Sequence, residues 1–128
     1  MREMVSAIAA FATAATAVVA MSGAAQAAPA GNSTVYGCLS GNVCIWPESV
    51  WPQENPHPTN QYASYGAHNL SHQFGYHWVL NNQYGGATAD LCANYGGTNC
   101  GEHLAQDQWT WTYLTPINSI RLNRPTLP

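Results

Sequence analysis

The stretch NNQYGGATADLCANYGGTNCG, residues 81–101, contains the tripeptide Tyr-Gly-Gly twice, starting at Tyr84 and at Tyr95. Glycine tolerates positive φ and close backbone approach, so each tripeptide predicts a tight turn. The segment between them, TADLCAN, is typical of a short strand, and a cysteine lies on each side of the second turn. We therefore expect the first turn to join two β units and the second to lie inside a clamped loop.

Short β-like runs recur along the rest of the chain, whereas helix-type spacing with caps is absent between positions 31 and 128. Turn residues separate the runs, which is typical of a sandwich or barrel. Four prolines within residues 47–60 forbid a central strand, so an ordered, partly extended loop is expected there. The runs expected to form strands are residues 42–46, 75–81, 88–94, 108–114 and 118–123.

The N-terminal residues predict an export signal. The apolar, alanine-rich run at 8–20 is too short to span a bilayer stably, although a membrane anchor is the alternative interpretation. Ala25-Gln26-Ala27 fits the small-x-small rule of signal-peptide cleavage, so the mature chain is expected to begin at Ala28 or Pro29. Residues 1–27 are thus interpreted as a secretory signal peptide, and the protein as secreted and extracellular.

The charge balance bears on the partners of the mature part, residues 28–128, which is long enough for one domain. The whole chain has no lysine and a formal net charge of −3. Neutralising phosphates requires a basic patch, so neither nucleic acid nor an anionic membrane is expected as a partner.

An internal repeat is visible but weak, and chance similarity between β-rich segments is the alternative. Residues 43–46 (VCIW) resemble 91–94 (LCAN), and 78–82 (WVLNN) resemble 119–123 (SIRLN). The repeat predicts a Greek-key sandwich of two four-stranded motifs, at about 36–82 and 83–124.

Three segments resemble a known family. Residues 36–46, YGCLSGNVCIW, resemble the opening of secreted bacterial βγ-crystallin-like proteins grouped with the metalloproteinase inhibitors, peptidase inhibitor family thirty-six. Residues 79–100 and 114–122 resemble that group's middle and carboxyl-terminal segments. The resemblance implies an all-β, βγ-crystallin-like Greek-key fold and an inhibitory activity.

The chain departs from the calcium-binding pattern of such folds. The corresponding segments, 74–78 and 114–119, contain no paired acidic residues, and hard cations need several oxygen ligands. We therefore expect no calcium site, although a degenerate one is left open. The first motif also reads Trp51-Pro52-Gln53 where the pattern has a glycine.

The four cysteines predict two disulfides in an exported domain of this size. Three pairings are possible, and we favour Cys38–Cys44 with Cys92–Cys100 because each closes a short loop within one motif. A zinc site that includes Cys92, Cys100 and His103 is the competing interpretation. Export to an oxidising space and the absence of Cys-x2-Cys spacing argue against it, so no metal or cofactor is expected.

The loop inside the second cysteine pair is the candidate binding element. A loop held at its base loses less conformational entropy on binding a partner. The structural interpretation, a hairpin corner, is compatible with this role. The candidate site comprises Asn94, Tyr95, Gly96, Gly97, Thr98 and Asn99, together with Trp46 and Trp51 beside the prolines, which we expect to be exposed.

Aromatic residues alternate in two segments. Trp109, Trp111 and Tyr113 alternate with threonines, so on a strand the three rings face one side. Phe74, Tyr76 and Trp78 alternate in the same way. We expect both ladders to form the core face of the sandwich, and the alternative is a stacking platform for polysaccharide.

No catalytic arrangement stands out, so the chain is not expected to be an enzyme. The five histidines are expected at the polar surface and in hydrogen bonds; they are His57, His68, His72, His77 and His103. The leading hypothesis is a peptidase inhibitor that contacts an extracellular peptidase through the clamped loop. The alternative is a module that binds polysaccharide or cell wall, in the manner of antimicrobial killer-toxin-like proteins.

Overall fold

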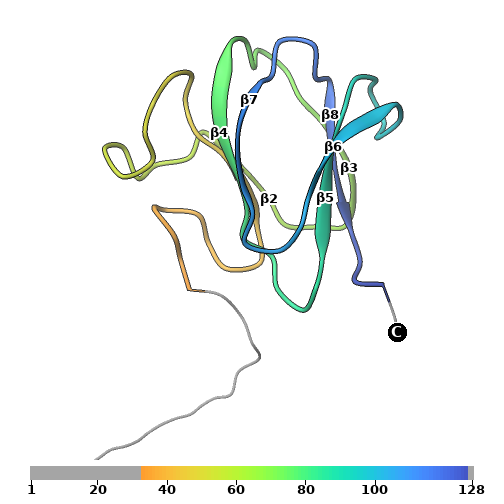
Figure 1. Ribbon diagram of the computed structural model, residues 1–128, viewed down its shortest axis with the longest axis horizontal. Helices are drawn as coiled ribbons and strands as arrows, with labels where there is room; N and C mark the ends of the chain where they lie inside the picture. The colour runs from red at the N-terminus through yellow and green to blue at the C-terminus, as the bar shows by residue number, and fades with distance from the viewer. Residues whose placement is uncertain (1–32, 127–128) are drawn as a thin grey trace, which may run out of the picture. The chain divides into compact units, whose positions relative to one another are not determined.

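The computed structural model describes residues 33–126, and the export signal predicted at 1–27 lies outside this range. Within the described residues the chain forms eight strands in two four-stranded antiparallel sheets (Figure 1). The strands are β1 (Val43–Ile45), β2 (Asn60–Tyr62), β3 (Gly66–Asn69), β4 (Tyr76–Asn81), β5 (Thr88–Cys92), β6 (Cys100–Leu104), β7 (Trp109–Tyr113) and β8 (Ser119–Asn123).

The two sheets have matching strand orders. The first sheet has the order β2-β1-β4-β7, and the second has the order β3-β8-β5-β6. The chain has two halves of four strands each, β1 to β4 and β5 to β8. The third strand of each half, β3 or β7, pairs in the sheet that the other half forms. This exchange couples the two halves, and the turn that begins at Tyr84 joins them, as the sequence predicts.

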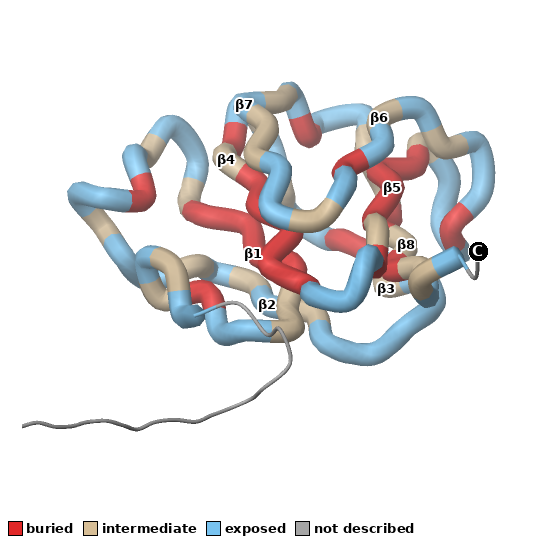
Figure 2. Tube along the Cα trace, turned by 60° about the horizontal axis from the view of Figure 1, so that its bottom comes forward, coloured by how far each residue is buried: buried red, intermediate tan, exposed pale blue. Residues whose placement is uncertain are grey.

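The core lies between the sheets and is aliphatic. The buried residues in Figure 2 are concentrated on the strands in the middle of the domain. Strand alternation points Val79 of β4 and Leu91 of β5 toward each other's sheet, because neighbouring residues on a strand face opposite sides. The buried cluster comprises Val43, Ile45, Leu70, Val79, Ala89, Leu91, Leu104, Leu114, Ile120 and Leu122. Burial of such side chains contributes roughly 1.5–3 kcal/mol each.

Each run predicted to form a strand contains one, namely β1, β4, β5, β7 and β8. The sequence analysis missed β2, β3 and β6, whose sequences are NQY, GAHN and CGEHL. All three lie at sheet edges. Edge strands are commonly short and polar, since they have no second neighbour and little apolar surface to bury.

The structure contradicts the prediction that the aromatic ladders form the core. Trp109, Trp111 and Tyr113 share one face of β7, but it is the outer face, and Trp111 and Tyr113 are 43% and 48% exposed. The cause is the pairing with β4, in which Thr110 lies opposite the inward-facing Val79. Paired residues face the same side, so the threonines of β7 face inward.

Trp46 corrects a second prediction, because it is completely buried rather than exposed. Its backbone N–H donates to the carbonyl of Trp78 at 3.1 Å, so the residue continues the first sheet beyond β1. Its ring contacts Trp109 at 5.1 Å between centroids. Trp51, in contrast, is 52% exposed, as expected.

The structure contains the two favoured disulfides among its described cysteines, Cys38–Cys44 and Cys92–Cys100. The first fastens the segment before β1 to that strand, and the second joins β5 to β6. Two disulfides in so small a domain indicate an oxidising environment. Among residues 33–126, no helix is long and apolar enough to cross a membrane.

The outer face of the second sheet carries a polar network around Asp90. Its Oδ1 accepts a hydrogen bond from His103 Nδ1 at 2.6 Å, and its Oδ2 accepts from Arg121 and Asn123 at 2.9 Å each. Burial alone would raise the pKa of Asp90, but the hydrogen bonds from His103, Asn123 and Arg121 outweigh it and lower the pKa. The carboxylate therefore links β5, β6 and β8.

Asp90→Asn is expected to lower the free energy of unfolding at neutral pH by roughly 1–3 kcal/mol, because charge-assisted hydrogen bonds are lost. The folded-state pKa of Asp90 is lowered, so its contribution is present above the ordinary aspartate pKa of about 3.9 and is lost as pH falls through the folded value. Urea unfolding at a series of pH values should show a smaller acid-induced loss of stability in the variant than in the parent.

Asp107→Asn is the matched control. Asp107 is exposed and has a φ of 67°, a conformation that asparagine also tolerates. The control should follow the parent's pH profile, and equal acid sensitivity of the parent and Asp90→Asn would contradict the role given to this network.

Candidate functional site

Exposed aromatic side chains gather on the outer face of the first sheet. Strand register places Trp78 of β4 directly opposite Trp111 of β7, and Tyr76 opposite Tyr113. Residues from two loops extend the group beyond the strands. We call this group the aromatic face; it comprises Tyr36, Trp51, Tyr76, Trp78, Trp109, Trp111 and Tyr113.

Ring-to-ring contacts make the aromatic face continuous. Tyr76 contacts Tyr113 at 5.1 Å between centroids and Trp111 at 5.6 Å. Trp78 contacts Trp111 at 5.4 Å and Trp109 at 6.0 Å. All four spacings lie in the range of favourable aromatic pairs, so each ring limits the movement of the next.

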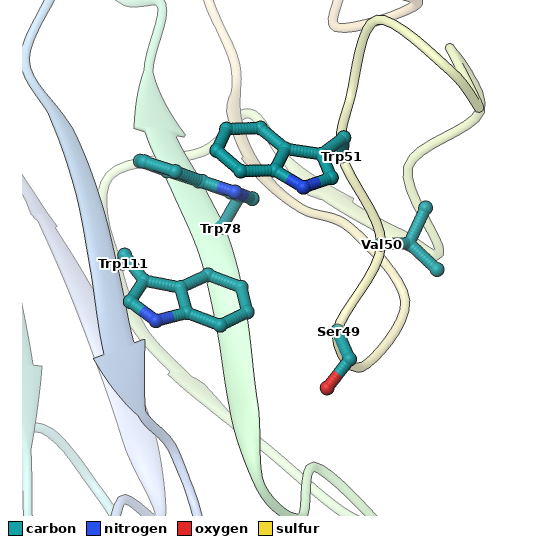
Figure 3. Close-up of a pocket in the computed structure, with 5 residues that line it drawn as sticks. All are labelled: Ser49, Val50, Trp51, Trp78 and Trp111. Carbon is teal, nitrogen blue, oxygen red and sulfur yellow. The ribbon is translucent and has the colours of Figure 1, made fainter.

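The proline-rich loop turns this array into a hollowed surface. Trp51 projects from that loop and contacts Trp78 at 5.4 Å. One cavity of about 340 Å³ lies among Ser49, Val50, Trp51, Trp78 and Trp111, with the three indoles drawn together in Figure 3. A second cavity of about 340 Å³ also borders Trp51 and Trp78, and its other lining residues are Tyr36, Pro52, Gln53 and Trp109.

Buried groups beneath the aromatic face hold it in place. Trp46, Leu80 and the Cys38–Cys44 disulfide form a second hydrophobic cluster, against which Trp78 and Trp109 pack. The indole N–H of Trp46 is buried and has no acceptor among the described residues. Because this cluster is buried and contains a disulfide, it limits how far the rings above it can move.

Hydrogen bonds fix the proline-rich loop to the sheet. The Ser49 N–H donates to the carbonyl of Tyr76 at 2.9 Å, and the Thr59 N–H donates to the carbonyl of Ile45 at 2.8 Å. His77 lies below the loop, with Nδ1 2.7 Å from the carbonyl of Trp46 and Nε2 2.8 Å from that of Phe74. The hydrogen-bonding role expected of His77 is confirmed, whereas its surface position is not, because it is 4% exposed.

The lining of both cavities is uncharged. Among the described residues that border them, the polar groups are those of Ser49, Gln53, Tyr36 and the indole nitrogens. The outer face of the second sheet differs, because it carries the ion pair between Asp90 and Arg121. The aromatic face therefore suits a neutral ligand that offers apolar faces and hydroxyl groups.

The loop predicted as the contact element is a short hairpin between β5 and β6. The Ala93 N–H donates to the carbonyl of Asn99 at 2.9 Å, and the Asn94 N–H donates to that of Thr98 at 3.2 Å. The Cys92–Cys100 disulfide closes its base. The loop is therefore folded back on itself rather than extended.

Side chains from neighbouring strands brace this hairpin. The Gly96 N–H donates to Asn69 Oδ1 at 2.8 Å, and Arg121 Nη1 donates to the carbonyl of Gly97 at 3.0 Å. Gly97 has a φ of 78°, and a Cβ there would lie 2.9 Å from the Cβ of Ala67. The second Tyr-Gly-Gly therefore requires glycine for both backbone conformation and space.

The structure separates the residues that the sequence analysis combined into one site. Tyr95 at the hairpin tip is 62% exposed and borders a cavity of about 300 Å³ with Phe74 and Ile117. Trp51 contacts Trp78 on the outer side of the first sheet. The hairpin between β5 and β6 instead extends the second sheet (Figure 1). Trp46 is buried, so of the two tryptophans only Trp51 is available to a partner.

The sequence analysis missed Tyr36, Ser49 and Gln53 as site residues. The alternating sequence of β7 showed only that its own aromatic rings share a face. Tyr36 lies outside any strand, and its ring contacts that of Trp109, with 6.3 Å between centroids, only once the chain has folded. Ser49 and Gln53 belong to the proline-rich loop, and its path cannot be deduced from composition alone.

The competing zinc interpretation is wrong for the cysteines, because Cys92 and Cys100 are joined to each other. His103, its third proposed ligand, instead contacts Asp90. Across residues 33–126, no group of three or more His, Cys, Asp or Glu side chains is arranged to hold a metal ion.

Compared with protein-family models, curated proteins and solved structures, the chain has no match. The resemblance to the peptidase inhibitors thus stays an expectation based on the three segments quoted above.

Proposed function

We propose that this chain is a secreted protein that binds neutral polysaccharide through the aromatic face. The observation that supports this function is a continuous array of surface tryptophan and tyrosine rings around two uncharged cavities. Monomeric soluble proteins rarely expose so many clustered aromatic rings without a binding role.

Sugar rings complement such a surface chemically. An aromatic ring has an electron-rich face, which attracts the electron-poor C–H groups on the apolar face of a pyranose. Hydroxyl groups at the sugar's rim would find partners in the Ser49 hydroxyl and the Gln53 amide, which border the cavities. Because the buried cluster holds the rings in place, little conformational entropy is lost on binding.

Charge favours a neutral glycan over other stacking ligands. Single-stranded nucleic acid also stacks on aromatic side chains, but its phosphates require basic residues. The chain has three Lys and Arg residues in all and a net charge of −3. Of these, Arg121 and Arg124 lie within residues 33–126, and neither borders the two cavities.

We further infer a βγ-crystallin-like Greek-key fold and export by the signal peptide at residues 1–27. The exchange of β3 and β7 between the sheets supports the fold assignment, and the two disulfides support passage through an oxidising compartment. An exported wall-binding protein could act on competing cells, in the manner of killer-toxin-like proteins.

Native gels that contain dissolved polysaccharides, together with pull-down on chitin, cellulose and peptidoglycan, test the proposal. The mature protein is expected to be retarded or retained by at least one polymer. Trp111→Ala should weaken that interaction roughly tenfold, because loss of one stacked ring removes about 1.4 kcal/mol.

Tyr84→Ala is the matched control, since Tyr84 is 45% exposed and lies outside the aromatic face. It should bind like the parent. The proposal fails if no polymer interacts with the parent protein, or if Trp111→Ala binds as well as the control.

The braced hairpin at Cys92–Cys100 favours a second candidate function, inhibition of an extracellular peptidase. The disulfide and the hydrogen bonds from Asn69 and Arg121 preorganise its tip. The tip presents Tyr95 as its large exposed side chain. We rank this function second because the folded-back hairpin offers a partner less apolar surface than the aromatic face.

Residual activity of a panel of metallo- and serine peptidases, measured with the mature protein in micromolar excess, tests inhibition. At least one peptidase should lose activity, and Tyr95→Ala should reduce the effect roughly tenfold by removing the exposed anchor. Tyr84→Ala again serves as the control. Full activity of every peptidase would exclude this function.

A further inference from the structure

The rings of the aromatic face are not coplanar. Trp78 is inclined by 42° to Trp51, by 45° to Trp111 and by 86° to Trp109. Among the ring contacts within this face, that of Tyr76 with Trp111 is nearest to parallel, at 20°. The flat surface of a polysaccharide crystal could therefore stack on a pair of these rings but not on the whole array.

The ring of Trp51 stands out from the surface that the strand residues form. This ring is supplied by the proline-rich loop rather than by a strand, and it borders both cavities of about 340 Å³. In Figure 3, Trp51 and Trp111 both lie next to Trp78, and the Ser49 side chain projects from the loop on their side, whereas that of Val50 points away. Residues of the loop and of the sheet together line each cavity.

Burial and backbone hydrogen bonds hold the proline-rich loop, and with it Trp51, in this position. Pro52, the next residue, is buried, and the Trp51 carbonyl accepts hydrogen bonds from the N–H groups of Glu54 and Asn55 at 3.0 Å each. Together with the bond from Ser49 to Tyr76, these contacts oppose flattening of Trp51 onto the sheet.

From this geometry we propose that the site selects individual glycan chains and not the face of a crystalline polymer, with one sugar subsite on each side of Trp51. This inference rests on the proposed polysaccharide-binding function. A single chain can turn its rings to follow inclined surfaces and enter both cavities. Chains locked side by side in a crystal cannot, and Trp51 would hold such a surface away from Trp78 and Trp111.

Depletion assays that compare two physical states of the same polymer test whether the site selects single chains. Swollen cellulose is compared with microcrystalline cellulose, and colloidal chitin with crystalline chitin, at equal accessible surface. We expect at least tenfold tighter binding to the swollen or colloidal form of a bound polymer, with displacement by the corresponding soluble cello- or chito-oligosaccharide.

Two outcomes overturn the inference in different ways. Equal or tighter binding to the crystalline form, or binding that oligosaccharides fail to displace, rejects single-chain selection and leaves polysaccharide binding intact. Absence of binding to all four solids also rejects it. The proposed function itself falls if dissolved polysaccharides and peptidoglycan fail to bind as well, or if Trp111→Ala binds as well as Tyr84→Ala.

A pair of variants tests the role of Trp51. Trp51→Ala should weaken oligosaccharide binding at least tenfold, whereas Tyr84→Ala, outside the aromatic face and both cavities, should change it less than twofold. Both residues are about half exposed, so unchanged urea midpoints are expected to show that the fold is retained. Equal oligosaccharide affinities in the two variants would show that Trp51 does not form the subsites and would overturn the inference.

Discussion

Val79 points inward from β4, and this orientation determines which face of the first sheet carries the aromatic rings. Its side chain lies in the aliphatic core, so Tyr76 and Trp78, at alternate positions, face outward. The antiparallel register then places Tyr113 and Trp111 beside them. The threonines between the β7 rings consequently face inward, and the five residues of β7 place three aromatic rings on the outer face of the sheet.

The remaining features support those rings. β7 reaches β4 because the third strand of each half pairs in the other half's sheet, so the surface exists only when both halves have folded together. Trp46 and the Cys38–Cys44 disulfide fill the space below Trp78 and Trp109. The proline-rich loop, which cannot enter a sheet, is free to carry Trp51 above it. The second sheet contributes stability through Asp90 on its own outer face.

Much of the fold could be predicted from the sequence, because apolar strands, turn glycines and cysteine spacing are local signals. Strands β2, β3 and β6 escaped because edge strands need little apolar surface. The alternation of Trp109, Trp111 and Tyr113 showed that they share a face, yet which face is buried depends on pairing with β4. Trp46 was misplaced for a similar reason: its neighbour Pro47 suggested a surface loop, whereas its backbone continues the sheet. Hairpin glycines were assigned correctly because positive φ is a property of single residues.

The most direct test of glycan binding by the aromatic face is titration of the isotopically labelled protein with soluble oligosaccharides of a polymer that it binds, followed through the indole N–H resonances of its five tryptophans. Concentration-dependent shifts are expected for Trp51, Trp78 and Trp111, with the smallest change at the buried Trp46. Unchanged indole resonances, or shifts confined to the backbone amides of residues 93–99, would show that the aromatic face is not the glycan-binding surface.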